Sequence, residues 1–283
     1  MADQSYLSIY AKSFNWAGFF LPKQTYLKCS ALYDFCRIAD NIADGDEDIE
    51  IKKENFLNFQ NNFNDQKFDD PIIKNMWRLI KEFNIPLKVV HDLLDGINSD
   101  IQKNIKLNKK KDLLLYSYRV AGTVGLMMAK ILKVNKKSSL KSAIDLGIAM
   151  QLTNISRDVV EDLNFGRSYI NLNFEEIKST IELSENYYEN SFYSIKQIPF
   201  TFRFAILVAR RVYRKIGYKI LKKQNLENYK KSGKIYVSNI EKIIETLLSI
   251  FDLIKLSLIS KNDDNIEHDH NLIIEEINLN ERI

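Results

Sequence analysis

Apolar residues recur at steps of three and four along most of this chain, which is the spacing of one face of an α-helix. The pattern is clearest at 26–38, 72–97, 113–132, 142–163, 200–221 and 235–258. Alternating apolar and polar positions and Asn-Gly hairpin signals, which are typical of paired strands, are missing from the sequence. Glycine (9) and proline (4) make up about 5% of the 283 residues, against roughly 12% in an average protein. The sequence therefore predicts an all-α protein.

Polar runs at 45–54, 61–70, 106–112 and 133–139 indicate connections between helices. No stretch rich in Pro, Gly and Ser divides the sequence, so residues 1–283 are expected to form a single domain. After about residue 261 the sequence is polar and acidic, and we expect this tail to fray.

Two helical segments carry a polar stripe where a core helix should be apolar. Segments 33–44 and 151–162 both end in Asp-x-x-x-Asp, so Asp40 lies one turn from Asp44, and Asp158 one turn from Asp162. The same faces carry Tyr33, Arg37, Gln151 and Asn154. Such pairs also occur on the solvated faces of acidic helices, but apolar residues surround the second segment. Burying polar groups there is costly unless they bind something.

Two carboxylate pairs facing one cavity would suit hard divalent cations, which prefer oxygen ligands and often complete their shell with substrate phosphates. Mg²⁺ is the natural candidate, and bound metal would relieve the repulsion between neighbouring carboxylates. Arg37 and Arg157 each lie beside an acidic pair and suit phosphate oxygens. We therefore expect an anionic, phosphorylated substrate.

Three further motifs accompany the acidic segments: S-F-N-W-A-G-F-F-L-P at 13–22, V-A-G-T-V-G-L-M-M at 120–128 and G-R-S-Y-I at 166–170. In this order and spacing, from about Lys12 to about Val237, the motifs resemble those of the squalene and phytoene synthases, most closely the bacterial phytoene synthases. The resemblance implies an isoprenoid-synthase-type helical bundle around a central cavity. Asn41, Asn171 and Lys234 depart from the family pattern, but both aspartate pairs are intact.

The resemblance also implies an activity. A 15-cis-phytoene synthase-like prenyltransferase joins two geranylgeranyl diphosphates head to head, through a cyclopropyl diphosphate, in carotenoid biosynthesis; it uses Mg²⁺ or Mn²⁺ and no NADPH. The implied metal ligands are Asp40, Asp44, Asn154, Asp158 and Asp162, the four aspartates being catalytic together with Tyr213. The implied diphosphate-binding or orienting residues are Lys12, Ser13, Tyr33, Arg37, Gln151, Arg157 and Arg167.

The resemblance also relates two glycines to the prenyl chain. Gly18 matches a chain-length position, and a missing side chain there would favour a C20 over a C15 substrate. Gly122 either lines the isoprenoid channel or allows close helix packing. Both alternatives are open at this stage.

Rival functions are also open. A squalene-type or dehydrosqualene-type synthase would use two C15 farnesyl diphosphates. An inactive assembly or regulatory subunit would keep the fold without turnover, and a generic helical interaction module would not need the aspartates at all.

Charge and composition mainly argue against other classes of protein. The net charge is +4, but Lys is interspersed with Asp and Glu, so we expect no nucleic-acid partner. No apolar run reaches about 18 residues and no export leader is evident, which predicts a cytoplasmic protein with peripheral contact at the cytoplasmic membrane face. Cys29 and Cys36 are expected to be reduced core thiols. A zinc ligand set and a phosphate-binding glycine loop are both missing.

Overall fold

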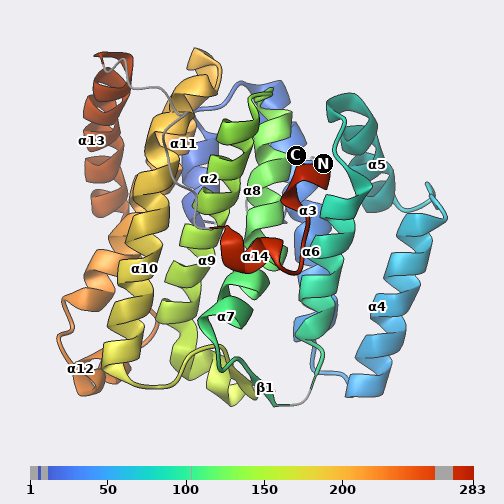
Figure 1. Cartoon of the computed structure of the whole chain (residues 1–283), viewed down its shortest axis with the longest axis horizontal. Coiled ribbons are helices and arrows are strands. Elements are labelled where there is room, and N and C mark those ends of the chain that lie inside the picture. The colour runs from blue at the N-terminus through green and yellow to red at the C-terminus, as the bar shows by residue number, and fades with distance from the viewer. Residues whose placement is uncertain (1–5, 8–11, 103, 259–269) are drawn as a thin grey trace.

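The computed structural model describes residues 6–7, 12–102, 104–258 and 270–283 and shows a bundle of helices (Figure 1). The first half contains α2 (Lys12–Gly18), α3 (Lys23–Asp44), α4 (Ile49–Asn64), α5 (Pro71–Phe83), α6 (Leu87–Ser99), α7 (Lys110–Ser117), the π-helical turn η1 (Tyr118–Gly122) and α8 (Thr123–Ile131). The second half contains α9 (Lys137–Asn164), α10 (Phe174–Phe192), η2 (Tyr193–Gln197), α11 (Phe200–Leu221), α12 (Leu226–Lys231), α13 (Asn239–Leu258), α14 (Asn271–Ile274) and η4 (Leu279–Glu281). The prediction of an all-α fold is confirmed.

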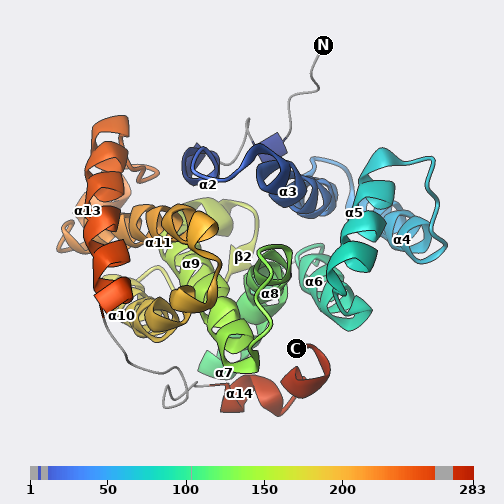
Figure 2. The same ribbon diagram turned by 90° about the horizontal axis from the view of Figure 1, so that it is seen from above.

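Helix α9 is the central element of the bundle. It packs against α8, η1, α10 and α11, and the view from above places it among these helices (Figure 2). Its buried side chains include Ile144, Ile148, Leu152 and Ile155. Helices α4 and α13 lie at opposite edges in both views. A helix that is surrounded on most sides exposes little surface to water. Polar side chains buried on α9 therefore cost free energy unless they form hydrogen bonds or bind a ligand.

The helical period at 72–97 spans two helices, α5 and α6. Asn84 ends α5 in the left-handed conformation, with φ 49°, and Pro86 follows as the residue before α6. A left-handed residue followed by proline cannot continue an α-helix. Both helices nevertheless pack against α3 and α8.

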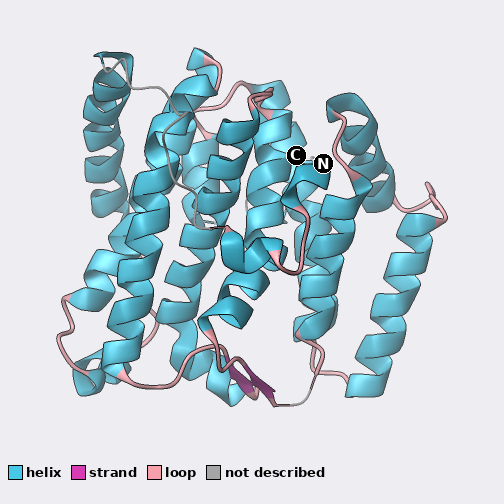
Figure 3. Ribbon diagram, viewed as in Figure 1, coloured by secondary structure: helices cyan, strands magenta, loops and turns pink. Residues whose placement is uncertain are grey.

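Only a short strand pair interrupts the helices in the part of the chain that the structure describes (Figure 3). Strand β1 (Ile105–Lys106) pairs in parallel with β2 (Arg167–Ser168), and Ile105 lies opposite Arg167. Gly166, with φ 74°, turns the chain from the end of α9 into β2, a conformation that favours glycine. This turn places Arg167 beside the end of α3.

The predicted fraying of the tail is wrong for its last fourteen residues, 270–283, while residues 259–269 lie outside the described part. Ile273, Ile277 and Leu279 are buried against the bundle, and α14 packs on α7. Arg282 donates to both carboxylate oxygens of Asp92, at 2.9 and 3.0 Å. Burial of these apolar side chains and the pairing of Arg282 with Asp92 both favour packing of this segment on the core.

Cys29 and Cys36 are free and buried, as expected. Among the residues described, no helix combines the length and the hydropathy needed to cross a bilayer.

Candidate active site

A cavity of about 1110 Å³ lies between α2, α3, α8, α9 and α11. Both predicted aspartate pairs line it. So do the other predicted residues Lys12, Ser13, Gly18, Tyr33, Arg37, Gln151, Asn154, Arg157, Arg167 and Tyr213. The fold therefore brings to one cavity side chains that come from distant parts of the sequence.

Gly122 is the exception among the predicted residues. It is buried, and a Cβ atom there would lie 3.0 Å from Ile144 and 3.2 Å from Tyr118 rather than in the cavity. Of the two alternatives, close helix packing is correct, and the prediction that Gly122 lines the channel is wrong. Its neighbours Ala121 and Gly125 line the cavity instead.

The first acidic pair lies on α3. This helix buries Leu32, Phe35 and Ala39 in the core, and the opposite polar stripe faces the cavity. Burial, and then the negative charge of Asp44, raise the pKa of Asp40 to about 7, while the positive charge of Arg37 opposes the shift. Such a carboxylate is short of compensating positive charge.

The second pair lies near the end of α9. Burial, and then the charge of Asp158, raise the pKa of Asp162 to about 7. Arg157 donates from Nε to Asp158 Oδ1 at 2.8 Å. The hydroxyl of Tyr229 on α12 donates to the Arg157 carbonyl at 2.8 Å and so fixes this part of α9. In both pairs, burial and the charge of the neighbouring aspartate thus raise the pKa of one carboxyl group.

Arg167 connects the two pairs electrostatically. Its Nη1 donates to Asp44 Oδ1 at 2.7 Å, and its Nη2 donates to the Asp100 carbonyl at 3.2 Å. The charge of Arg167 opposes the rise in pKa of both Asp40 and Asp162. One guanidinium therefore acts on both helices, so the pairs belong to a single site.

The squalene/phytoene synthase family model matches residues 8–173, more than half of the chain and including both aspartate pairs. This chain belongs to the squalene/phytoene synthase family. It is 27% identical to a 15-cis-phytoene synthase of Pantoea ananas over 247 residues, 76% of this chain and 80% of that protein. It is 36% identical to a 15-cis-phytoene synthase of Enterobacter agglomerans over 151 residues, 46% of this chain and about half (51%) of the relative.

The fold comparison agrees with the family. A dehydrosqualene synthase crystallised with a ligand is 28% identical and superposes with a TM-score of 0.70, over 89% of this chain and 95% of that protein. The expected isoprenoid-synthase-type helical fold is therefore confirmed for this member of the squalene/phytoene synthase family.

Asp100 is an acidic residue of this family member that the sequence did not single out. It follows α6 and accepts hydrogen bonds from the hydroxyls of Tyr116, at 2.8 Å, and Tyr169, at 2.7 Å. Burial raises the pKa of Asp100 to about 6 despite these bonds and the charge of Arg167. One aspartate after a helix makes no pattern, and only the fold shows that it adjoins both pairs.

Two lysines beyond the family match, which ends at residue 173, were also not predicted as site residues. Lys234 and Lys242 line the cavity, and Lys234 Nζ lies 3.5 Å from Asp158 Oδ1. Burial, and then the charge of Lys12, lower the pKa of Lys242. Lys12 and Lys242, from opposite ends of the sequence, therefore place two positive charges at the same part of the cavity.

Tyr213 supplies a phenol to the same region. Its ring centroid lies 4.8 Å from that of Phe14, and burial raises its pKa to about 12, with the charge of Arg157 opposing the shift. Tyr213 is therefore a neutral hydroxyl near neutral pH, able to donate a hydrogen bond to an anion.

The donor set fits a hard divalent cation in its chemistry. Asn154 Oδ1 is buried without a hydrogen-bond partner, and burial and the charge of the other aspartate in each pair raise the pKa values of Asp40 and Asp162. Within the described ranges no group of three His, Cys, Asp or Glu side chains is already arranged around a metal position. Arg157 and Arg167 instead hold Asp158 and Asp44. Metal binding at this site stays a prediction.

Proposed function

We propose that this protein condenses two geranylgeranyl diphosphates head to head, through a cyclopropyl diphosphate, to give phytoene. The observation that carries the proposal is a single cavity in which two aspartate pairs adjoin a long apolar wall. The apolar part is lined by Val120, Val124, Met128, Leu132, Leu146 and Met150. Phosphorylated heads and prenyl tails need these two kinds of surface side by side.

The positive side chains would bind the two diphosphate groups. Arg157 and Arg167 now donate to Asp158 and Asp44, and incoming phosphate oxygens would compete for the same guanidinium groups. Lys12 and Lys242 add point charges at the cavity wall. Once the arginines turn to the phosphates, the carboxylates lose their partners and become available as ligands.

Asp40, Asp44, Asp158, Asp162 and Asn154 would then hold Mg²⁺ or Mn²⁺. Bound metal would neutralise the negative charge that develops on the leaving diphosphate oxygens. The chain's own contribution is to keep the reacting carbons dry, because water would trap an allylic cation. The neutral phenol of Tyr213 donates toward oxygen anions without becoming a nucleophilic phenolate.

Gly18 supports a long substrate. It lines the cavity, and a Cβ atom there would lie 2.7 Å from the ring of Tyr26. A bulky side chain at position 18 would therefore displace Tyr26 or fill the adjoining space. The C20 preference implied by this glycine stays part of the proposal.

The second candidate is a dehydrosqualene-type or squalene-type synthase using two C15 farnesyl diphosphates. It is favoured by the structural likeness to a dehydrosqualene synthase, at 28% identity and over most of both chains. The named phytoene synthase relatives, at 27% and 36% identity, favour the C20 reaction.

A product assay separates these candidates. The purified protein is incubated with Mg²⁺ and radiolabelled C15 or C20 diphosphate, and the hexane extract is resolved by chain length and ultraviolet spectrum. We expect a C40 hydrocarbon with a conjugated triene from the C20 substrate, with no requirement for NADPH. A C30 product from the C15 substrate alone would favour the second candidate. No product from either substrate would overturn both and leave the inactive subunit.

A further inference from the structure

Segment 270–283 joins two helices on the side of the bundle away from the cavity opening. Figure 2 shows α14 on the opposite side from α2 and α3, with α8 and α9 between them. His270, 1% exposed, pairs through Nε2 with Asp145 Oδ1 of α9 at 2.6 Å. Arg282 donates to both carboxylate oxygens of Asp92 on α6. The segment therefore holds α9 at its beginning and α6 at its end.

The contact with α9 is made on the rear face of that helix. At 100° per residue, Asp145 lies roughly 100° to 160° around α9 from Ala143, Leu146 and Met150, which line the cavity. Asp145 is fully buried, and a buried carboxylate needs hydrogen bonds to offset its loss of water. The ring of His270 supplies one of them. Segment 270–283 thus supports from behind the helix that forms one wall of the cavity.

Asp92 extends the contact of α6 to the π-helical turn η1. Its Oδ2, which accepts from Arg282, also accepts a hydrogen bond from the hydroxyl of Tyr118 at 2.9 Å. Tyr118 is fully buried and is the first residue of η1. Val120 and Ala121 of the same turn line the cavity. A chain of hydrogen bonds therefore runs from Arg282 to a turn of the cavity wall.

The turn η1 is packed tightly between α6 and α9. On the α6 side, a Cβ atom at Gly96 would lie 2.7 Å from Arg119 Cβ. On the α9 side, a Cβ atom at Gly147 would lie 2.2 Å from the carbonyl oxygen of Ala121. Both distances are too short for non-bonded atoms, so the backbones approach as closely as glycine allows. The spacing between α6 and α9 therefore decides where η1 lies, and π-helical turns often occur at functional sites.

We propose that segment 270–283 is a strap that sets the width of the cavity at η1. It does so by fixing the spacing of α6 and α9 and by orienting Tyr118 through Asp92. Arg282 and His270 are positioning residues, since neither lines the cavity. An effect of the strap on the choice of prenyl substrate rests on the proposed function; its effect on η1 does not.

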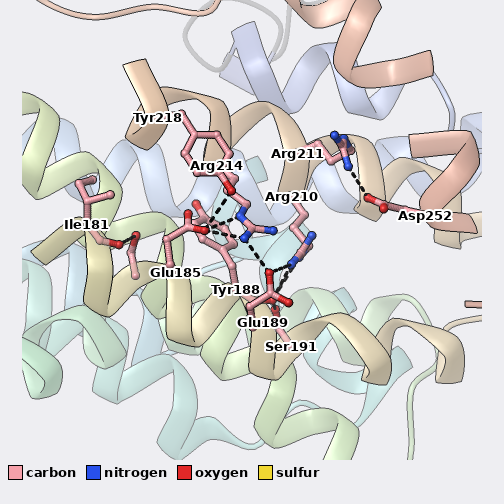
Figure 4. Close-up of polar contacts among 11 residues, drawn as sticks. Ile181, Glu185, Tyr188, Glu189, Ser191, Arg210, Arg211, Arg214, Tyr218 and Asp252 are labelled. Atoms are coloured by element: carbon pink, nitrogen blue, oxygen red, sulfur yellow. Dashed lines mark hydrogen bonds and ion pairs between the residues drawn. The ribbon is translucent and has the colours of Figure 1, made fainter. Parts of the chain in front are cut away.

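An ion pair of similar burial elsewhere in the fold provides a matched control. Arg214 of α11 donates from Nε to Glu185 Oε2 of α10 at 2.6 Å, and the hydroxyl of Tyr218 lies 3.1 Å from the same oxygen (Figure 4). The side chains of Arg214 and Glu185 are 22% and 21% exposed, against 16% and 9% for Arg282 and Asp92. This pair joins α10 to α11 rather than α6 to η1, so its loss tests stability without the strap.

Hydrogen exchange in the whole protein, without substrate, tests the strap. Amide exchange is followed by mass spectrometry in the wild type, Arg282→Ala and Glu185→Ala. We expect exchange at residues 118–122 to be about tenfold faster in Arg282→Ala and unchanged in Glu185→Ala. Wild-type exchange at 118–122 in Arg282→Ala would overturn the proposal. So would an equal increase in both variants, because it would report a general loss of stability.

Tyr118→Phe tests the same connection with segment 270–283 still in place. The substitution removes only the hydroxyl that donates to Asp92. We expect faster exchange at 118–122 and wild-type exchange at 270–283. Unchanged exchange at 118–122 would overturn the role of Asp92 in orienting the turn.

Turnover of C15 and C20 diphosphates then measures the effect on substrate choice. A loosened wall discriminates less, so the ratio of kcat/KM for C20 to that for C15 should fall severalfold in Arg282→Ala and stay at the wild-type value in Glu185→Ala. A wild-type ratio in Arg282→Ala, with faster exchange at 118–122, would remove the strap from substrate selection. If the wild type turned over neither substrate, the proposed function would fail, while the exchange result would still decide whether the strap controls η1.

Discussion

Helices α9 and α13 both bury polar side chains, but for different reasons. On α13 the carboxylates of Glu245 and Asp252 have a partner on α11, because both contact Arg211. At the cavity end of α9, burial and the charge of Asp158 instead raise the pKa of Asp162 to about 7. The same condition holds for Asp40 on α3.

The comparison shows that burial of a polar group does not by itself identify a functional site. Charges that are balanced within the fold, as on α13, contribute to the packing of helices. Charges that the fold leaves in excess, as around Asp40 and Asp162, are expected to be balanced by something that binds. In this protein the second condition occurs where the family's acidic motifs meet.

The largest expected effect is on turnover. Asp40→Asn removes one predicted metal ligand, and we expect turnover to fall by about 10³-fold or more, or about 4 kcal/mol of barrier, with the helical circular dichroism unchanged. Initial rates with C20 diphosphate and Mg²⁺ measure this. The same substitution at the balanced helix, Asp252→Asn, is the control and should leave turnover within about twofold. Equal loss of turnover in both variants would contradict the distinction between excess charge at the cavity and balanced charge on α13.

The next effect is on stability. Glu245→Ala on α13 leaves Arg211 and Lys215 without a buried carboxylate partner, so we expect the free energy of unfolding to fall by about 2 to 4 kcal/mol. Urea unfolding followed by circular dichroism measures the change. A fully stable Glu245→Ala protein would mean that α13 is held by something other than these pairs.

The pH dependence of stability distinguishes the two helices further. Burial and the charge of Asp44 raise the pKa of Asp40 to about 7 in the folded chain. The protonated carboxyl therefore contributes fully to the free energy of unfolding below pH 4, and this contribution is lost as the pH rises through 7. Asp40→Asn should therefore be more stable than the wild type at pH 8 without metal, by about 1 to 3 kcal/mol, and not at pH 4. Thermal melts in EDTA at both pH values test this. If Asp40→Asn were less stable than the wild type at pH 8, the negative charge around Asp40 would not be in excess.

The smallest expected effect concerns chain length. Gly18→Phe places a ring against Tyr26 at the cavity wall, and we expect the ratio of C15 to C20 turnover to rise severalfold. Gly217→Ala is a useful control, because the glycine packs against Ile181 away from the cavity lining. An unchanged ratio in Gly18→Phe would remove position 18 from substrate selection.

The sequence predicted the helical class, the family and, except for Gly122, lining residues of the cavity, because motifs at helical spacing can be recognised without knowing how the helices pack. It did not predict α4 and α10. In α10 the buried face includes Thr180, Ser184 and Ser191, which interrupt the apolar period. It could not show that the apolar face of α13 points outward, since periodicity defines a face but not its direction. Asp100 and the packing of Gly122 depend on contacts between distant segments.

The most direct test of the account is the position of the metal in a complex. Crystals grown with Mn²⁺ and an unreactive thiolo analogue of geranylgeranyl diphosphate would show manganese by its anomalous scattering. We predict manganese between the diphosphate and both pairs, Asp40 with Asp44 and Asp158 with Asp162, and Arg157 turned from Asp158 to a phosphate oxygen. An ordered analogue whose diphosphate binds away from both pairs, with no manganese at either, would contradict the account.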